Sequence, residues 1–157
     1  MKSNKLEIPL LLWQQMILEL RNRGMGERES GAFLLAKQNS RRVERFICYD
    51  DLDETALDSG IIMFHANGFV RLWNICSDMG FKVIADVHTH PDAWTGQSYA
   101  DKSHPMVAQT GHISLIVPDY AQGNDNSLKG VGVYEYLGSH KWKTYSPKVT
   151  DLAVALL

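Results

Sequence analysis

Apolar residues recur along this chain with two periods, one typical of helices and one typical of strands. Leu10, Trp13, Ile17 and Leu20 follow the spacing of a single helix face, and Gly24 supplies a stop signal at its end. The sequence therefore predicts an amphipathic first helix that covers one face of a sheet.

A second helical period runs from Ile62 to Met79, and Gly80 ends it. The acidic segment at positions 50–58 comes before this period. We expect that segment to be a loop leading into the second helix, because acidic side chains stabilise a helix N-terminus.

Short apolar runs bounded by polar residues, glycine or proline predict the strands. They cover residues 32–36, 43–49, 83–87, 113–117, 131–136 and 142–145. The first two should form a hairpin through the polar stretch K-Q-N-S-R-R, and the last two a hairpin around Gly138. The tail at positions 150–157 is apolar on several sides, so it could form a last helix or dock onto another subunit.

Helices combined with a mixed, mainly antiparallel set of strands define the fold class as α/β, or α+β in the looser sense. The chain has 157 residues, of which 45% are apolar, which suits one hydrophobic core. We therefore expect a single domain over residues 1–157. The formal charge of -2 provides no basic surface for nucleic acid, so we expect no nucleic-acid partner.

The sequence contains no apolar run of about 18 residues and no signal-peptide cleavage site, so we expect neither export nor membrane insertion. Cys48 and Cys76 have no paired spacing and are expected to be small buried side chains in a reducing compartment. These features favour the cytoplasm.

The most informative stretch follows the apolar run at positions 83–87, which has the pattern of a strand buried on both faces. His88 and His90 close that strand, and their spacing of two places both imidazoles on the same side. Ser98 and Asp101 then lie three residues apart where a helical turn begins, so they point toward one place.

Two imidazoles and one carboxylate form the ligand set of a catalytic zinc site, whose fourth position is left for water. His-x-His alone is equally compatible with two ordinary histidines, but Ser98 and Asp101 favour the metal site. Gly96 is expected to let the chain turn between the two parts of the motif. Two other folds also use His-x-His for metal binding. A cupin is excluded because no glutamate follows at the required distance, and an amidohydrolase barrel needs a longer chain.

A metal hydrolase also needs a base, and Glu29 in E-S-G-A-F-L-L-A is the candidate, with Glu27 as the alternative. Together, Glu29, His88-Thr89-His90-Pro91 and the Ser98-x-x-Asp101 pair resemble the JAMM motif of the JAB/MPN metallopeptidase family. Several motif pieces in the correct order are more specific than any one of them. The resemblance extends over most of the chain, approximately residues 9–136.

This resemblance implies a curved mixed sheet flanked by helices, with the metal at one edge. It implies one zinc ion with a catalytic water, held by His88, His90 and Asp101. Glu29 would act as general base and Ser98 as donor to the oxyanion.

The same resemblance implies an isopeptidase that removes or processes a ubiquitin-like modifier. It also implies E1-like and E2-like partners of the kind found in bacterial anti-phage conjugation systems. A zinc hydrolase of another peptide or small amide, and a non-catalytic MPN binding module, remain open alternatives. Trp94 either shapes the substrate groove or serves simple packing, and the sequence does not decide between these.

Overall fold

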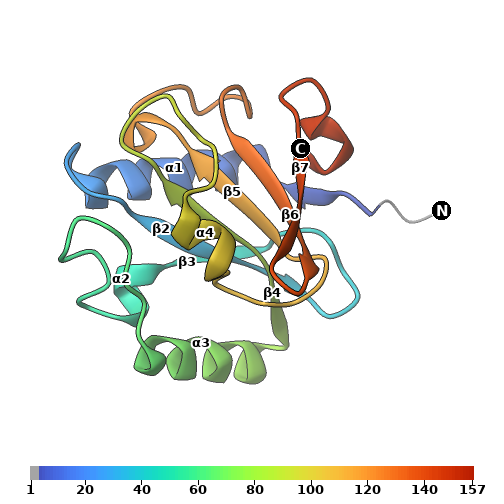
Figure 1. The fold of residues 1–157 in the computed structure, drawn as a ribbon. Coiled ribbons are helices and arrows are strands. Elements are labelled where there is room, and N and C mark those ends of the chain that lie inside the picture. Colours follow the sequence, from blue (N-terminus) through green and yellow to red (C-terminus); the bar gives the residue numbers. More distant parts are fainter. Residues whose placement is uncertain (1–3) are drawn as a thin grey trace.

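A mixed sheet of six strands forms the centre of residues 4–157, the part of the chain that this computed structural model describes (Figure 1). Its strands are β2 (Gly31–Lys37), β3 (Arg45–Cys48), β4 (Phe81–Thr89), β5 (Ile113–Val117), β6 (Gly132–Gly138) and β7 (Lys141–Tyr145). Their order is β3-β2-β4-β5-β6-β7, and only β4 and β5 run parallel among these neighbours. The predicted mixed, mainly antiparallel α+β fold and both predicted hairpins are confirmed. The first three residues of the predicted domain lie outside the described range.

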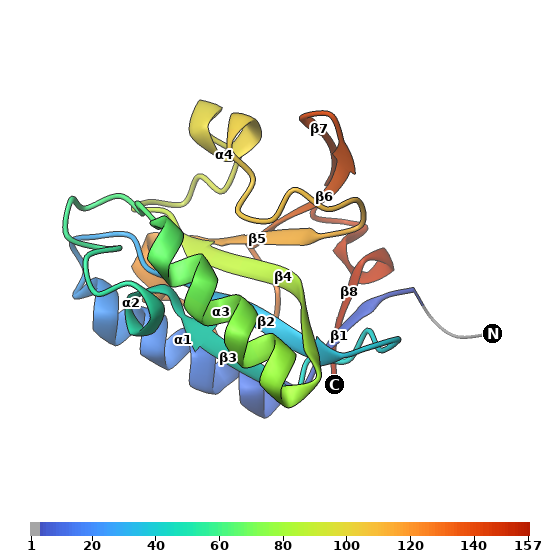
Figure 2. The same ribbon diagram turned by 90° about the horizontal axis from the view of Figure 1, so that it is seen from below.

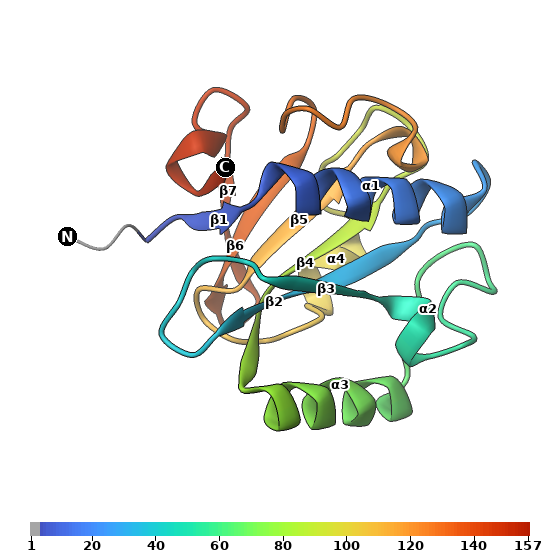
Figure 3. The same cartoon turned by 180° about the vertical axis from the view of Figure 1, so that it is seen from behind.

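Helices cover both faces of this sheet. The side chains of β2 alternate between two cores: Ala32, Leu34 and Ala36 face the core under α1 (Leu10–Gly24), whereas Phe33 and Leu35 face the core under α3 (Ala66–Met79). Figure 3 shows α1 lying across one face. The short helix α4 (Tyr99–Ser103) lies on the opposite side of the sheet from α1 (Figure 2). The predicted first helix is thus confirmed.

The second helix begins later than predicted, at Ala66 rather than Ile62. Asp53 is the physical reason, because its carboxylate accepts a hydrogen bond from the backbone N–H of His65 (2.9 Å) and contacts the His65 ring nitrogen (2.7 Å). This holds His65 in an extended conformation at the N-cap. The residues before it, 61–64, are therefore free to line a cleft.

The acidic segment at positions 50–58 does not lead directly into that helix. Its first residues form the short helix α2 (Tyr49–Leu52), where Asp50 and Asp51 lie in the first turn. Both carboxylates accept hydrogen bonds from Arg23 at the end of α1 (3.0 and 2.7 Å). These charges thus tie α2 to α1, and only Asp53 acts at the start of α3.

The tail does not form the last helix considered from the sequence, and part of it packs within this chain. A 3-10 turn, η2 (Thr150–Leu152), leads into strand β8 (Val154–Leu156), which pairs in parallel with β1 (Leu6–Ile8). Leu6, Ile8 and Val154 are buried in the core under α1. The N-terminal strand β1, which the apolar pattern did not indicate, therefore packs with the opposite end of the chain (Figure 3).

Strand β4 is buried on both faces over most of its length, as its apolar run predicts. It lies between β2 and β5, so the histidine motif leaves the sheet at the end of a central strand rather than at a lateral edge. Cys48 and Cys76 are buried and free, as expected. Within residues 4–157, no helix combines the length and apolar character needed to cross a membrane.

Candidate metal centre

The side chains of His88, His90 and Asp101 meet at the end of β4. The two Nε2 atoms lie 3.3 Å apart. Asp101 places Oδ1 3.3 Å from Nε2 of His88 and Oδ2 3.3 Å from Nε2 of His90. One ligand atom from each residue can be chosen so that all three lie within 4.8 Å of one another. Both imidazoles are thus on the same side of the strand, as the spacing of two predicts.

These separations suit zinc. Ligand atoms about 2.0–2.1 Å from a tetrahedral zinc ion are about 3.3 Å from one another. The two Nε2 atoms have this separation, and each of them lies at the same distance from a different oxygen of Asp101. Imidazole nitrogen and carboxylate oxygen are common zinc ligands. The three residues could therefore hold a zinc ion and leave one coordination position open.

A backbone contact fixes the orientation of His90. Its Nδ1 lies 3.2 Å from the carbonyl oxygen of Trp94, so Nδ1 carries the proton and donates it. The lone pair is then on Nε2, the atom that faces His88 and Asp101. A hydrogen bond of this kind from the second ring nitrogen is usual for a metal-bound histidine.

Helix α4 begins with a capping box that places Asp101. The hydroxyl oxygen of Ser98 accepts a hydrogen bond from the N–H of Asp101 (3.0 Å), and Oδ2 of Asp101 accepts one from the N–H of Ser98 (2.9 Å). The carboxylate is therefore held in place before any ion binds. The Ser98 hydroxyl still has its own proton to donate, because it acts only as an acceptor in the cap.

The contacts among these residues shift their pKa values in opposite directions. Burial opposes the charge on Asp101, but the contacts with His88 and His90 hold the pKa of that carboxyl well below its usual range. Burial also opposes the charge on His88, and Asp101 more than compensates, so the pKa of His88 is raised. The Asp101 carboxylate thus stays charged and favours positive charge on the groups beside it.

Glu29 lies just before β2 and faces the same region. Its N–H donates to the carbonyl of Gly60 (2.8 Å). Burial raises its pKa, against the opposing influence of His88, His90 and a backbone hydrogen bond from Ile62. A carboxyl group with a raised pKa beside a metal site suits proton transfer. Glu27, the alternative base, is exposed and is not among the residues that line the adjoining cleft.

A cleft of about 730 Å³ opens beside the three ligands. Glu29, His88, Ser98 and Asp101 contribute to its lining, so four of the five predicted site residues share one cavity. The rest of the lining is mainly apolar and comes from the 61–64 segment, α3, the residues after α4 and β7. Its apolar side chains are Ile61, Ile62, Met63, Phe64, Phe69, Pro105, Met106 and Trp142. The cavity thus joins a polar metal corner to an apolar surface.

The floor of the cleft contains polar residues that sequence analysis missed. Asp86 is buried on β4, where its Oδ2 lies 2.6 Å from Nε2 of His112 and its Oδ1 accepts a hydrogen bond from Ser114 (3.2 Å). Tyr49, also buried, adds a ring to the lining. The sequence could have indicated Asp86, because its spacing of two from His88 puts both side chains on one face of β4.

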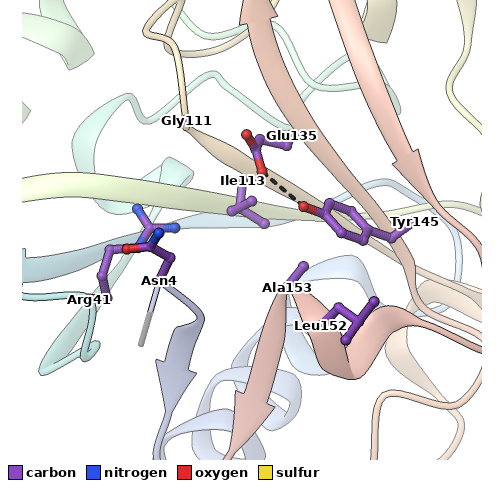
Figure 4. A pocket seen from close by; sticks show the side chains of 8 residues that line it. All are labelled: Asn4, Arg41, Gly111, Ile113, Glu135, Tyr145, Leu152 and Ala153. Atoms are coloured by element: carbon purple, nitrogen blue, oxygen red, sulfur yellow. Dashed lines mark hydrogen bonds between the residues drawn. The ribbon is translucent and has the colours of Figure 1, made fainter. Parts of the chain in front are cut away.

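A second cavity of about 410 Å³ lies on the other face of the sheet. Ile113 and Glu135 line it and face each other across β5 and β6, whereas the next residue of β5, Ser114, lines the metal cleft. Figure 4 shows Arg41 on one side of this cavity and the hydrogen-bonded pair of Glu135 and Tyr145 (3.0 Å) on the other. None of the predicted site residues lines it.

Comparison with known proteins identifies the fold. No protein-family model matches the chain. Three solved structures resemble it over most of their length. A protein from Desulfitobacterium hafniense is 15% identical, with a TM-score of 0.63 over 96% of this chain and 92% of that chain. A JAB1/MPN domain protein from Archaeoglobus fulgidus is 16% identical, with a TM-score of 0.52 over 96% and 98%. A protein from Salinibacter ruber is 17% identical, with a TM-score of 0.57 over 89% and 88%.

The comparisons establish the fold of this chain and nothing finer. At identities this low, a structural likeness establishes the fold and leaves the activity to be argued from the site. The chain has the JAB1/MPN fold, and it carries a group of two histidines and one aspartate that could bind a metal ion.

Proposed function

We propose that this protein is a zinc-dependent peptidase or isopeptidase that removes or processes a ubiquitin-like modifier. One observation carries the proposal: three ligand atoms within 4.8 Å of one another adjoin a cleft that also receives Glu29 and Ser98. The JAB1/MPN fold supports the proposal. The resemblance of the sequence to the JAMM motif also supports it, since that resemblance concerns the same residues.

Each residue has a separate role in the proposed reaction. His88, His90 and Asp101 hold the ion, which when bound lowers the pKa of water from about 15.7 to about 7. Glu29 takes the proton from the attacking water and delivers it to the departing amine, a task that suits its raised pKa. Ser98 donates a hydrogen bond from its hydroxyl to the carbonyl oxygen as negative charge develops there.

The proposed substrate is the flexible C-terminal tail of a modifier joined to a lysine amine. A cleft of about 730 Å³ is large enough for several residues of an extended chain, and its apolar wall offers contacts for their side chains. The proposal also includes E1-like and E2-like partners of a bacterial anti-phage conjugation system. We also propose that the protein is cytoplasmic, which the two free cysteines support.

The direct test is cleavage of a ubiquitin-like fusion by the zinc-loaded protein. Glu29→Gln should retain zinc and lose at least about 100-fold in kcat/KM, the scale of a missing general base. Glu27→Gln is the matched control, since it removes an exposed carboxylate two residues away and should leave the rate unchanged. A fully active Glu29→Gln variant would refute the assigned base.

The same assay separates the alternatives. Cleavage of short peptides without cleavage of modifier fusions would indicate a zinc hydrolase with another substrate. A zinc-loaded protein that cleaves neither would indicate a binding module, in which the metal only stabilises the fold.

A further inference from the structure

Trp94 lies against one of the metal ligands. Its indole stacks on the imidazole of His90, with ring centroids 5.3 Å apart and planes inclined by 21°. Trp94 is nevertheless 57% exposed as a residue, and it is absent from the residues that line the cleft. Trp94 therefore contacts His90 without being buried and without lining the cleft.

The segment that carries this indole is tied down at several points. The N–H of Trp94 donates to the Asp92 carboxylate (3.0 Å). The next residue, Thr95, donates its hydroxyl to the carbonyl of Gly130 (2.9 Å) and accepts a hydrogen bond from the Tyr134 hydroxyl at its own carbonyl (2.6 Å). The ring therefore stacks on His90 from a fixed support.

Gly96 leaves room for the ring. A Cβ atom at this position would lie 2.7 Å from three atoms of the Trp94 indole, closer than real Cβ contacts allow. The backbone at Gly96 does not have a positive φ. Glycine is thus needed here for space rather than for the turn conformation expected from the sequence, and the atoms that need the space belong to Trp94.

We propose that Trp94 is a positioning residue for the metal: its indole braces the imidazole of His90 and slows release of the ion. Stacking restricts rotation of the imidazole about its χ2 bond, while the Trp94 carbonyl fixes its tautomer. The indole touches no reacting atom. The inference rests on the proposed metal site and is independent of which substrate the cleft accepts.

The first test measures zinc release from the loaded full-length protein to a chromogenic chelator. Trp94→Ala should release zinc at least about 10-fold faster than wild type, the scale of losing a contact to a metal ligand, and Trp94→Phe should fall between them. Trp73→Phe is the matched control, because Trp73 is also exposed and stacks on Phe69 at 21°, on the outside of α3. It should release zinc at the wild-type rate.

The second test uses a double-mutant cycle with Gly96→Ala. Alone, this substitution pushes the indole away from His90 and should speed zinc release. In the Trp94→Ala background the obstructing ring is gone, so the same substitution should have no effect. The melting temperature of the metal-free protein should be nearly unchanged in all variants, which separates bracing of the metal from general stability.

The outcomes distinguish failure of the bracing role from failure of the metal site. If Trp94→Ala and Gly96→Ala release zinc at the wild-type rate, the bracing role is wrong although the metal site stands. If Gly96→Ala speeds release equally in both backgrounds, it acts through the backbone and not through the indole, which also overturns the proposal. Wild-type protein that holds no zinc would remove the metal site itself.

Discussion

In the proposed function, Ser98 and Asp101 each serve both helix α4 and the metal centre. The Ser98 oxygen accepts from a backbone N–H, and the proposed catalytic role uses its proton, so the two functions do not compete. The Asp101 carboxylate completes the capping box with the same side chain that would bind the ion. A substitution at either position therefore changes local structure and chemistry together, and variants must separate the two.

Ser98→Ala tests this combination. Loss of the cap should lower the free energy of unfolding by about 1 kcal/mol, and loss of the oxyanion donor should lower kcat/KM by about 100- to 1000-fold while zinc is retained. Ser98→Thr keeps a hydroxyl that can cap and donate, so it should recover most of both. Denaturant unfolding and steady-state kinetics measure the two effects. An unchanged rate in Ser98→Ala would contradict the donor role.

The Glu29→Gln substitution should also change the stability of the metal-free protein. Folding raises the pKa of Glu29, so the folded state disfavours its charge and this carboxyl destabilises the protein at pH values above its folded pKa. The neutral glutamine should therefore raise the melting temperature of the metal-free protein near neutral pH. The difference should vanish below about pH 4, where the carboxyl is protonated in both states. Equal melting temperatures at neutral pH would contradict the raised pKa.

Helix α4, which carries Asp101, depends on a long-range contact. Trp142 on β7 donates its indole N–H to the carbonyl of Lys102 (3.0 Å), across 40 positions of sequence, and its ring packs on Tyr136. With only five residues, α4 is too short to be stable by itself. Its position therefore comes from the capping box at one end and Trp142 at the other.

Trp142→Phe should loosen that arrangement. The phenyl ring retains most of the packing but cannot donate to Lys102, which should lower the free energy of unfolding by about 1 kcal/mol. It should also weaken zinc binding severalfold, because Asp101 is no longer held as firmly. Competition with a chelator of known affinity measures the second effect. Wild-type zinc affinity in this variant would show that the capping box alone places the carboxylate.

The elements differ in how well the sequence predicts them, and the reasons are physical. Strand β4 and helix α1 follow clear apolar periods, so both were predicted. The start of α3 was misplaced because Ile62 continues the apolar period, whereas the Asp53 contact that ends the loop at His65 spans 12 positions. The ligand set has short spacings and is visible locally. Asp86 lines the cleft and contacts His112, which comes just before β5. Pairing of β4 with β5 brings these two residues together, and no local pattern reveals that contact.

For the molecule as a whole, the pairing of β1 with β8 connects the two ends of the chain beside the core under α1. Three-residue strands give almost no apolar period, which explains why the sequence predicted neither. Their contribution comes from tertiary burial. Leu6 is fully buried there, although it lies close to the start of the chain.

Leu6→Ala should therefore destabilise the protein by about 2–5 kcal/mol, the range for a leucine removed from a packed core. Leu11→Ala is the matched control, because Leu11 is 67% exposed on α1 and its loss should cost no more than about 0.5 kcal/mol. Denaturant unfolding of both variants measures the difference. Similar costs for the two would show that β1 does not belong to the cooperative core.

The most direct test of the account is the zinc content of the purified full-length chain, measured by native mass spectrometry. We expect one zinc per chain in wild type and in Glu29→Gln, and none in Asp101→Asn, whose amide can still complete the capping box but is a poor zinc ligand. Wild-type protein that binds no zinc, or an Asp101→Asn variant that keeps a full equivalent, would contradict the metal centre.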